Sequence, residues 1–235
     1  MTASLTKRYS NHLQFQVNYT FSKAIDNFID FASFQNAFRP SRLNLFRGIS
    51  VFDIPHNFVA NAVYTTPFKT RTGNFLSSVF ADITLSPIVS IRSGLPFSIR
   101  TPSLANGLAL DNNFATPFGA PRDGNRGASY SNVDLSIRKA LYINRDRGVK
   151  LDLIATGTNI FNKVNFNRVS DLFDINGIPG NGIVQTARGP LNLFTGPYSG
   201  LHGVRPTSAS QITQPLFYSS ADLPRQIQFG LRLAF

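Results

Sequence analysis

The feature that most constrains this chain is a two-residue alternation of apolar and polar side chains. Between His12 and Ser22 every odd position is apolar or aromatic and every even position is polar. Successive side chains of a β-strand point to opposite faces, so the segment predicts a strand with one apolar and one polar face. The pattern recurs over 81–100, 132–143 and 226–235. Apolar runs stay far below the ~20 residues of a membrane-spanning helix, which favours strands.

Strands are predicted over seven segments: 1–9, 11–24, 56–68, 79–100, 130–143, 149–166 and 225–235. Short polar connections (9–11, 69–74 and 144–148) alternate with long ones (27–55, 102–129 and 167–224). Short turns at one end and long loops at the other are typical of bacterial outer-membrane barrels, with the short turns in the periplasm. We therefore predict an all-β, antiparallel transmembrane β-barrel segment, in which residues 1–235 form part of one barrel domain.

An odd number of strands is unusual, because bacterial single-chain barrels use even numbers and sheet edges are not tolerated in lipid. Either 167–224 contains an eighth strand, or the chain is the last part of a larger barrel. The start, Met1 to Arg8, has no apolar stretch of the kind found in signal peptides, which favours the second explanation. The expected location is the bacterial outer membrane, as part of a longer protein.

Two residues disturb the alternation. Lys139 falls on the apolar face, so it is expected near an interface, where its ammonium group can reach water. Pro87 lacks a ladder donor, so a bulge or irregularity is expected there.

Composition argues against several function classes. The chain has no Cys and three scattered His, so neither a thiolate nor a His-built metal site is expected, and no cofactor is predicted. The net charge is +11, but the Lys and Arg residues form no run, so nucleic-acid binding is not expected.

Candidate catalytic and metal-binding residues are weak. Asp53 and His56 resemble a carboxylate–imidazole pair, but a turn before a strand explains them better. The stretches 111–113 and 123–125 offer oxygen ligands without the spacing of an EF-hand, and Asx-rich turns are the favoured interpretation. No nucleophile motif such as G-x-S-x-G is present, so the chain is not expected to be an enzyme.

Two sets of residues are candidates for contact with a solute. Arg92, Arg100, Arg138 and Arg232 fall on polar strand faces, where they would line a lumen. They would favour anionic solutes or pair with acidic groups of a plug, unless the wall is simply hydrated. A Phe-rich loop would either contact a ligand or pack on itself; its aromatic residues are Phe28, Phe31, Phe34, Phe38, Phe46 and Phe52.

The last predicted strand, 225–235, ends in an aromatic residue on its apolar face. Phe229, Leu231, Leu233 and Phe235 share its apolar face. Chain ends usually fray, so a terminal Phe on an alternating strand favours a role in recognition by the barrel assembly machinery. The apolar face itself implies outer-membrane lipid as a partner.

Five stretches resemble the C-terminal part of the Oar-like TonB-dependent outer-membrane receptors, which carry a carboxypeptidase-regulatory-like domain. They are Tyr19–Asn27 (YTFSKAIDN), Phe52–Val59 (FDIPHNFV, with Pro55 in place of the usual Arg), Ser93–Phe97 (SGLPF), Asn159–Phe166 (NIFNKVNF) and Pro224–Phe235.

The resemblance implies a 22-stranded barrel and energised uptake, or export-related traffic, of an unidentified solute. The plug and the segment that engages TonB would lie outside residues 1–235, so TonB would act only through those regions. Two alternatives remain: a small standalone barrel that acts as an adhesin or interaction protein through its long loops, and a soluble β-sandwich that binds polyanions.

Overall fold

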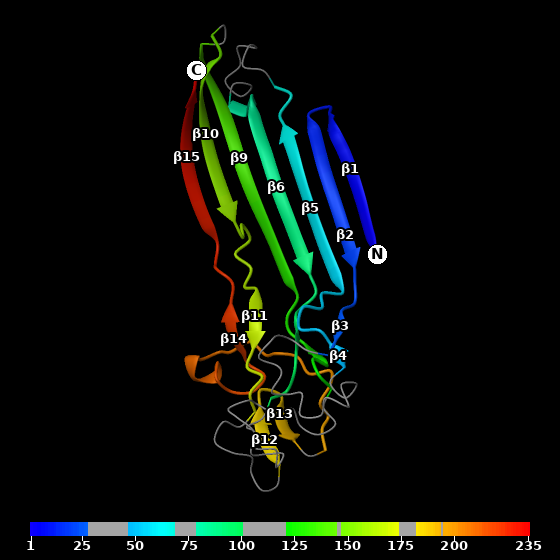
Figure 1. Cartoon of the computed structure of the whole chain (residues 1–235). Helices are drawn as coiled ribbons and strands as arrows, with labels where there is room; N and C mark the ends of the chain where they lie inside the picture. The colour runs from blue at the N-terminus through cyan, green and yellow to red at the C-terminus, as the bar shows by residue number, and fades with distance from the viewer. Residues whose placement is uncertain (28–46, 69–78, 101–120, 145–146, 174–181, 194) are drawn as a thin grey trace.

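The computed structural model describes residues 1–27, 47–68, 79–100, 121–144, 147–173, 182–193 and 195–235. Its main element is one antiparallel sheet of seven strands in the order β1-β2-β5-β6-β9-β10-β15 (Figure 1). Its strands are β1 (Thr2–Ser10), β2 (Leu13–Phe21), β5 (His56–Thr65), β6 (Ile83–Arg92), β9 (Tyr130–Asn144), β10 (Val149–Thr158) and β15 (Gln226–Ala234). The prediction of an all-β, antiparallel fold is confirmed. The sheet is not closed, because within the described residues β1 and β15 each pair on one side only.

The register places the apolar positions of all seven strands on the same face. One row of directly opposed residues runs Leu5, Val17, Ala60, Val89 and Val133, and a second runs Ile137, Ala155 and Phe229. The adjacent row on the opposite face runs Asn18, Val59, Ser90 and Asn132. Opposed residues of antiparallel strands share a face, so the alternation in each strand produces one apolar and one largely polar surface.

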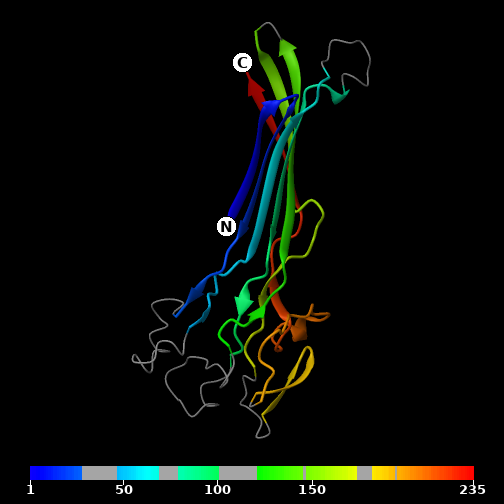
Figure 2. The same ribbon diagram turned by 90° about the vertical axis from the view of Figure 1, so that its right-hand side faces the viewer.

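The sheet is a single layer that leads down into a separate group of loops (Figure 2). The ten residues of β6 extend about 33 Å at ~3.3 Å per residue. Tilted by ~40°, such a strand rises roughly 25 Å, which is the height of one apolar membrane band. Among the helices within the described ranges, none is long and apolar enough to span a membrane.

The predicted irregularities have separate outcomes. The pairing of β6 with β5 is interrupted at Pro87, because Ala62 and Val63 of β5 have no partners on β6. The register is the same before and after this interruption. The expected irregularity is therefore present without a bulge, and the ladder to β9 continues through Pro87. Lys139 lies on the apolar face and donates to the carbonyl of Ala81 at the turn end of the sheet. Its place near a membrane interface stays a prediction.

The two ends of the sheet differ in their connections. At one end, Asn11 and His12 join β1 to β2 with φ of 49° and 64°, the positive values of a two-residue type I′ hairpin turn. The C-terminus lies at this end together with the β9–β10 turn (Figure 1). The β5–β6 connection, expected over 69–74, is longer and extends from Thr66 to Asp82.

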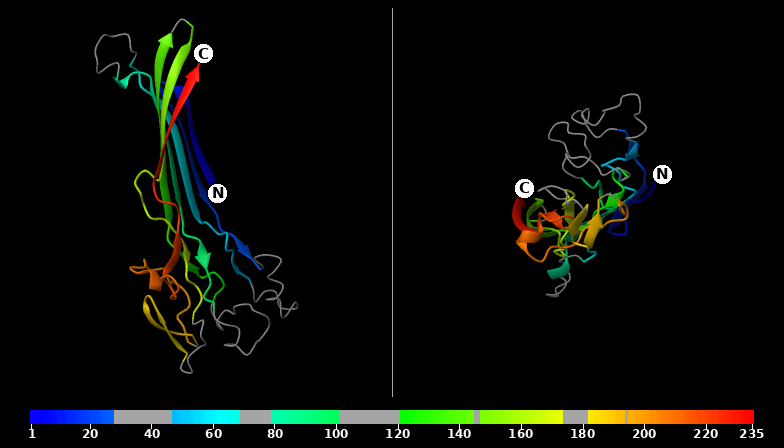
Figure 3. Two further views of the ribbon diagram at one scale, coloured as in Figure 1. Left: turned by 90° about the vertical axis from the view of Figure 1, so that its left-hand side faces the viewer. Right: turned by 90° about the horizontal axis from the view of Figure 1, so that it is seen from below.

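The long connections at the other end contain a second structure, which we call the cap. It consists of residues 22–55, 93–129 and 159–225 as far as they are described. Its strands are β3 (Ile25–Asp26), β4 (Gly48–Ile49), β7 (Pro96–Phe97), β8 (Asn125–Arg126), β11 (Phe166–Val169), β12 (Ile183–Thr186), β13 (Gly189–Asn192) and β14 (Tyr218–Ala221). They pair as β3–β4, β7–β8, β11–β14 and β12–β13, and one 3-10 turn, η5, spans Ala209–Gln211 (Figure 3).

Two predicted strands were too long, and the described residues also bear on the possible eighth strand. The strand expected over 149–166 ends at Thr158. The strand expected over 79–100 is confined to Ile83–Arg92, and its last residues belong to the cap. The described part of 167–224 adds no strand to the seven-stranded sheet, because its strands belong to two separate two-stranded sheets, β11–β14 and β12–β13.

Candidate functional site

The cap has the buried core that the sheet lacks. A cluster of buried side chains joins the second and third long connections; its members are Phe97, Ile99, Val169, Phe173, Val184, Leu191, Leu193, Leu216 and Tyr218. Phe173 and Leu216 are 0% and 1% exposed. Ring stacking of Phe166 on Tyr218, with centroids 4.4 Å apart, extends the cluster toward the sheet.

Arginine–aspartate pairs connect each long connection to its neighbour. Arg122 and Arg126, in the second connection, pair with Asp26 and Asp53 of the first. Arg100 makes a forked contact with Asp171 of the third, with Nη2 and Nε 2.6 and 2.7 Å from the two carboxylate oxygens. Residues 71 to 96 positions apart in sequence are joined in this way, and no local pattern in the sequence indicates these partners.

Asp53 and His56 have different partners from one another. Asp53, 1% exposed, accepts hydrogen bonds from the backbone N–H of Ala24 at 2.6 Å and from the Arg126 guanidinium. The Nδ1 atom of His56 lies 2.7 Å from the Tyr19 hydroxyl. The favoured interpretation of this stretch as a structural junction therefore agrees with the contacts.

The asparagines of Asn159–Phe166 fix the ends of three sheet strands. Asn165 exchanges two hydrogen bonds with the backbone of Ser131, of 3.0 and 2.9 Å, at the start of β9. Asn162 accepts from the N–H of Arg225, just before β15. Asn159 follows β10 directly, and it accepts from the N–H of Lys163. The motif thus orients the third connection relative to the sheet.

In the Ser93–Phe97 motif, Gly94 allows a close approach of two backbone segments. A Cβ atom at Gly94 would lie 2.1 Å from the carbonyl oxygen of Gly127, a distance that no side chain tolerates. This contact lets β7 pair with β8 and brings Phe97 into the core of the cap.

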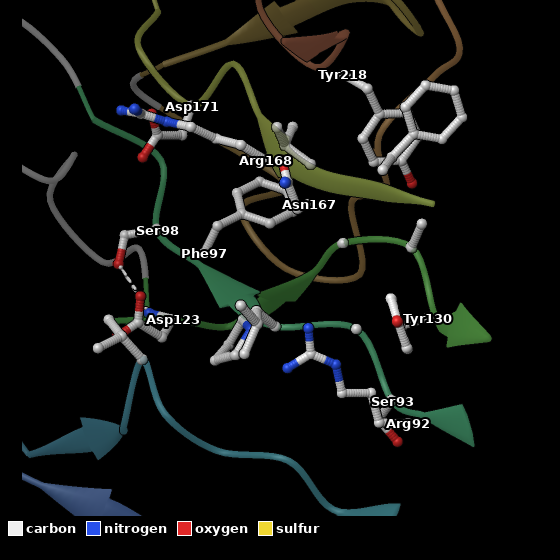
Figure 4. Close-up of a pocket in the computed structure, with 18 of the residues that line it drawn as sticks. Arg92, Ser93, Phe97, Ser98, Asp123, Tyr130, Asn167, Arg168, Asp171 and Tyr218 are labelled. Atoms are coloured by element: carbon white, nitrogen blue, oxygen red, sulfur yellow. Dashed lines mark hydrogen bonds between the residues drawn. The ribbon is translucent and has the colours of Figure 1, made fainter. Parts of the chain in front are cut away.

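A cavity of about 510 Å³ lies between the loop end of the sheet and the cap. All three long connections line it: Val51 and Phe52 from the first, 93–98 and Gly127 from the second, and 166–169, Asp171 and Tyr218 from the third. Arg92 and Tyr130, which face each other across β6 and β9 on the polar face, form its boundary with the sheet (Figure 4).

The charged groups of the cavity differ in their contacts. The guanidinium carbon of Arg92 lies 4.8 Å from the centroid of the Tyr130 ring. Arg100 pairs with Asp171, and Asp222 accepts a hydrogen bond from Asn167 at 2.9 Å. Among the described residues, Arg92 and Arg168 form no ion pair.

Asp123 is the most buried acid of the cavity. Burial raises the pKa of its carboxyl group, which the 2.8 Å hydrogen bond from Ser98 and the charge of Arg122 partly oppose. Burial also lowers the pKa of Arg122, whose Nε atom lies 4.0 Å from Oδ2 of Asp123. The two opposite charges are thus only weakly paired, and Asp123 lines the cavity.

The four arginines predicted to line a lumen are separated by the structure. Arg92, Arg138 and Arg232 lie on the polar face of the sheet, where they oppose Tyr130, Thr84 and Asp152. Arg100, predicted on a strand face, instead follows the end of β6 and belongs to the cap. The cavity brings Arg92 and Arg100 together and leaves Arg138 and Arg232 outside it.

Other candidate residues lie outside the described ranges: 111–113 and Phe28, Phe31, Phe34, Phe38 and Phe46 of the Phe-rich loop. Phe52 of that loop is 73% exposed and lines the cavity. Asp123 and Asn125 hold loops together, since Asn125 bonds the backbone of Tyr198 and Leu201. Within the described ranges, no group of three or more acidic or histidine side chains is placed to hold a metal ion.

Sequence reasoning did not identify Tyr130, Arg168 or the cavity itself. The wall of the cavity is formed by segments that are distant in the sequence, and alternation indicated only that Arg92 lies on the polar face of its strand.

Comparison with known proteins gives one match. A family model described as an outer membrane beta barrel domain matches residues 1–113, which include β1, β2, β5 and β6. No curated protein and no solved structure matches the chain. The match and the antiparallel, two-faced sheet together point to a protein of the bacterial outer membrane that contributes strands to a β-barrel.

Proposed function

We propose that the chain forms the last part of the barrel wall and the solute-facing loops of a TonB-dependent outer-membrane receptor or transporter. The observation that carries the proposal is the sheet register, which gathers the apolar residues of all strands on one face. Phe229, Leu231 and Phe235 on this face are 84%, 74% and 97% exposed. Lipid is the solvent in which such a face is stable.

The open edges support membership of a larger barrel. β1 and β15 are each nine residues long, and each has one unpaired edge within the described chain. Unsatisfied backbone groups cost several kcal/mol each in lipid, so further strands are needed on both sides. A barrel of 22 strands, the size typical of the Oar-like receptors, would supply them.

The cap supports a receptor role. Its three long connections are held together by partly buried ion pairs and a hydrophobic core, and they line a cavity at the end of the polar face. A wall with a built binding surface at its mouth suits capture of a solute before passage. In this role the chain performs no catalysis and uses no cofactor. It contacts lipid through its apolar face and the assembly machinery through β15, and energy from TonB arrives through other segments.

The test uses the full reading frame, expressed in the outer membrane. Uptake of solutes from culture supernatant is compared between the intact protein and a deletion of 1–235, each with and without TonB. We expect TonB-dependent uptake that is lost on deletion; uptake that is independent of TonB would contradict the proposal.

A second experiment tests the larger barrel. Cysteines are placed at Thr6 on β1 and Gly230 on β15, in residues 1–235 expressed alone and in the full frame. We expect no disulfide and no heat-modifiable monomer from residues 1–235 alone. A closed monomer with a β1–β15 disulfide would instead favour a standalone barrel.

The alternative is an adhesin or interaction protein that acts through its long loops. The exposure of Phe52 and Leu223, 73% and 71%, favours it, because both lie in the cap and are available to a partner. Cells that display Phe52→Ser would then lose adhesion, whereas TonB would have no effect on the phenotype.

A further inference from the structure

We propose that the cavity between the sheet and the cap binds an organic carboxylate, and that the Arg92 guanidinium receives the carboxylate group. The inference deepens the proposed function, on which it rests, since it names the class of solute that the mouth of the barrel would take. It is carried by the contacts of the arginines around the cavity.

Arg92 differs from the neighbouring arginines of the second connection. Arg100, Arg122 and Arg126 each pair with an aspartate of another connection. Arg92 is partly buried, and its contact within the described chain is the face of Tyr130 at 4.8 Å. A partly desolvated guanidinium without a carboxylate retains its capacity for forked hydrogen bonds, which matches the two oxygens of a carboxylate.

The position of Arg92 makes that capacity available to a ligand. Its side chain extends from the end of β6 into the cavity, toward the loop that carries Phe97 (Figure 4). Stacking on Tyr130 restricts the guanidinium to one orientation, which lowers the entropy lost when an anion binds. A second cation, Arg168, lines the same cavity and forms no ion pair among the described residues.

The acidic groups of the cavity are already engaged. Asp171 is held by both nitrogens of the Arg100 fork, and Asp222 accepts from Asn167. Asp123 accepts from the Ser98 hydroxyl, and its Oδ2 atom lies 4.0 Å from Nε of Arg122. These contacts weaken the repulsion that a bound anion would otherwise meet.

The rest of the lining defines the body of the ligand. Phe52, Leu95 and Tyr218 supply apolar and aromatic surface from the three long connections. The volume of about 510 Å³ lies within the range of ~300–1,000 Å³ that is usual for small-molecule sites. The cavity therefore suits an anion with an apolar or aromatic body better than a small inorganic ion.

The test measures binding of 1-naphthoate to the full-length protein extracted from outer membranes, by equilibrium dialysis, with 1-naphthamide as the neutral control. We expect Arg92→Gln to weaken naphthoate binding about tenfold or more, as loss of a charge-assisted forked contact predicts. Arg92→Lys, which keeps the charge but loses the fork, should fall between. Arg205→Gln is the matched control, because Arg205 is an exposed cap residue outside the cavity.

Equal binding of naphthoate and naphthamide to the unchanged protein would overturn the inference, and this comparison holds even if Arg92→Gln fails to assemble. Equal losses from Arg92→Gln and Arg205→Gln would also overturn it. Arg92-dependent binding without TonB-dependent uptake would support the inference and remove the proposed transport. TonB-dependent uptake without Arg92-dependent binding would support the proposed transport and overturn the inference about Arg92.

Discussion

Phe229 of the sheet and Phe173 of the cap are the same residue type, but the first is exposed and the second is buried. On the sheet, Phe229 is 84% exposed, and no second layer of described protein covers the apolar face. In the cap, Phe173 is 0% exposed within a cluster drawn from two long connections. The sheet requires lipid to cover its apolar residues, whereas the cap buries its own.

The polar groups follow the same division. The sheet satisfies its backbone through long regular ladders, and Arg92, Arg138 and Arg232 lie on its polar face. The cap has short strands, and ion pairs and asparagine contacts hold its loops together. We infer that the two regions open independently: the cap as a small folded unit in water, and the sheet as part of a membrane wall.

The largest expected effect tests this independence. Phe173→Ala should destabilise the cap by about 3–5 kcal/mol, because it leaves a cavity in the core. Phe229→Ala should cost the sheet about 1.5–3 kcal/mol of apolar transfer and leave the cap unchanged. Hydrogen exchange of the membrane-embedded protein, measured separately for cap and sheet peptides, checks both. Faster exchange in both regions from either change would show that they open together.

A second pair compares the two faces of one strand. Ile137 and Ser136 are neighbours at the same depth on β9, with Ile137 on the apolar face and Ser136 on the polar face. Ile137→Arg should cost roughly 2–4 kcal/mol in the lipid-exposed position. Ser136→Arg should cost much less, because its side chain enters the hydrated face. Urea unfolding in lipid vesicles measures the difference, and similar losses would refute the assignment of lipid to the apolar face.

A third change tests the ion pairs of the cap. Asp53→Asn removes the charge that matches Arg126 and weakens the acceptor for the Ala24 N–H. Loss of a buried, charged hydrogen-bond partner is expected to cost about 1–3 kcal/mol, with faster exchange at Ala24. Asp222→Asn is the control, since Asp222 is exposed and its carboxylate accepts a hydrogen bond from the neutral amide of Asn167. Equal effects would mean that burial of Asp53 adds nothing.

The smallest effect is a pH dependence confined to the cap. Burial raises the pKa of Asp123, so between about pH 4, where the unfolded carboxyl titrates, and the raised pKa, the folded cap retains a proton that the unfolded chain has released. Stability from this group is therefore present at low pH and is lost as pH rises through the raised pKa. Asp123→Asn should remove this loss, which melting of the two proteins over about pH 4–7 would detect. If the wild-type protein instead gained stability relative to the variant as pH rises, the predicted direction of the pKa shift of Asp123 would be wrong.

The segment 79–100 shows how far alternation can be followed. The apolar residues Leu95, Phe97 and Ile99 continue the period of β6 past its end at Arg92. Phe97 and Ile99 are buried in the core of the cap rather than facing lipid. Alternation records which side chains need an apolar environment, and it does not distinguish lipid from protein. Arg100 was misplaced on the sheet for the same reason.

The candidate site was predictable only in part. Arg92 was identified because its position on the polar face follows from the period of β6. Tyr130 lies beside it through the register of β9 against β6, a pairing of residues 38 positions apart that no single strand reveals. The cavity further depends on Gly94, whose need for space against Gly127 becomes visible only when both segments are in place.

The sequence by itself determined which residues of each strand share a face and where the strands of the sheet lie, because a strand's period of two is a local property of the backbone. The tertiary structure decided that the sheet is open at β1 and β15, that the long connections form a cap, and which arginines of the cavity have no aspartate partner among the described residues. Those features depend on the path of the chain between distant residues. Arg126 pairs with Asp53, which lies 73 positions away in the sequence, and local sequence patterns do not predict such a contact.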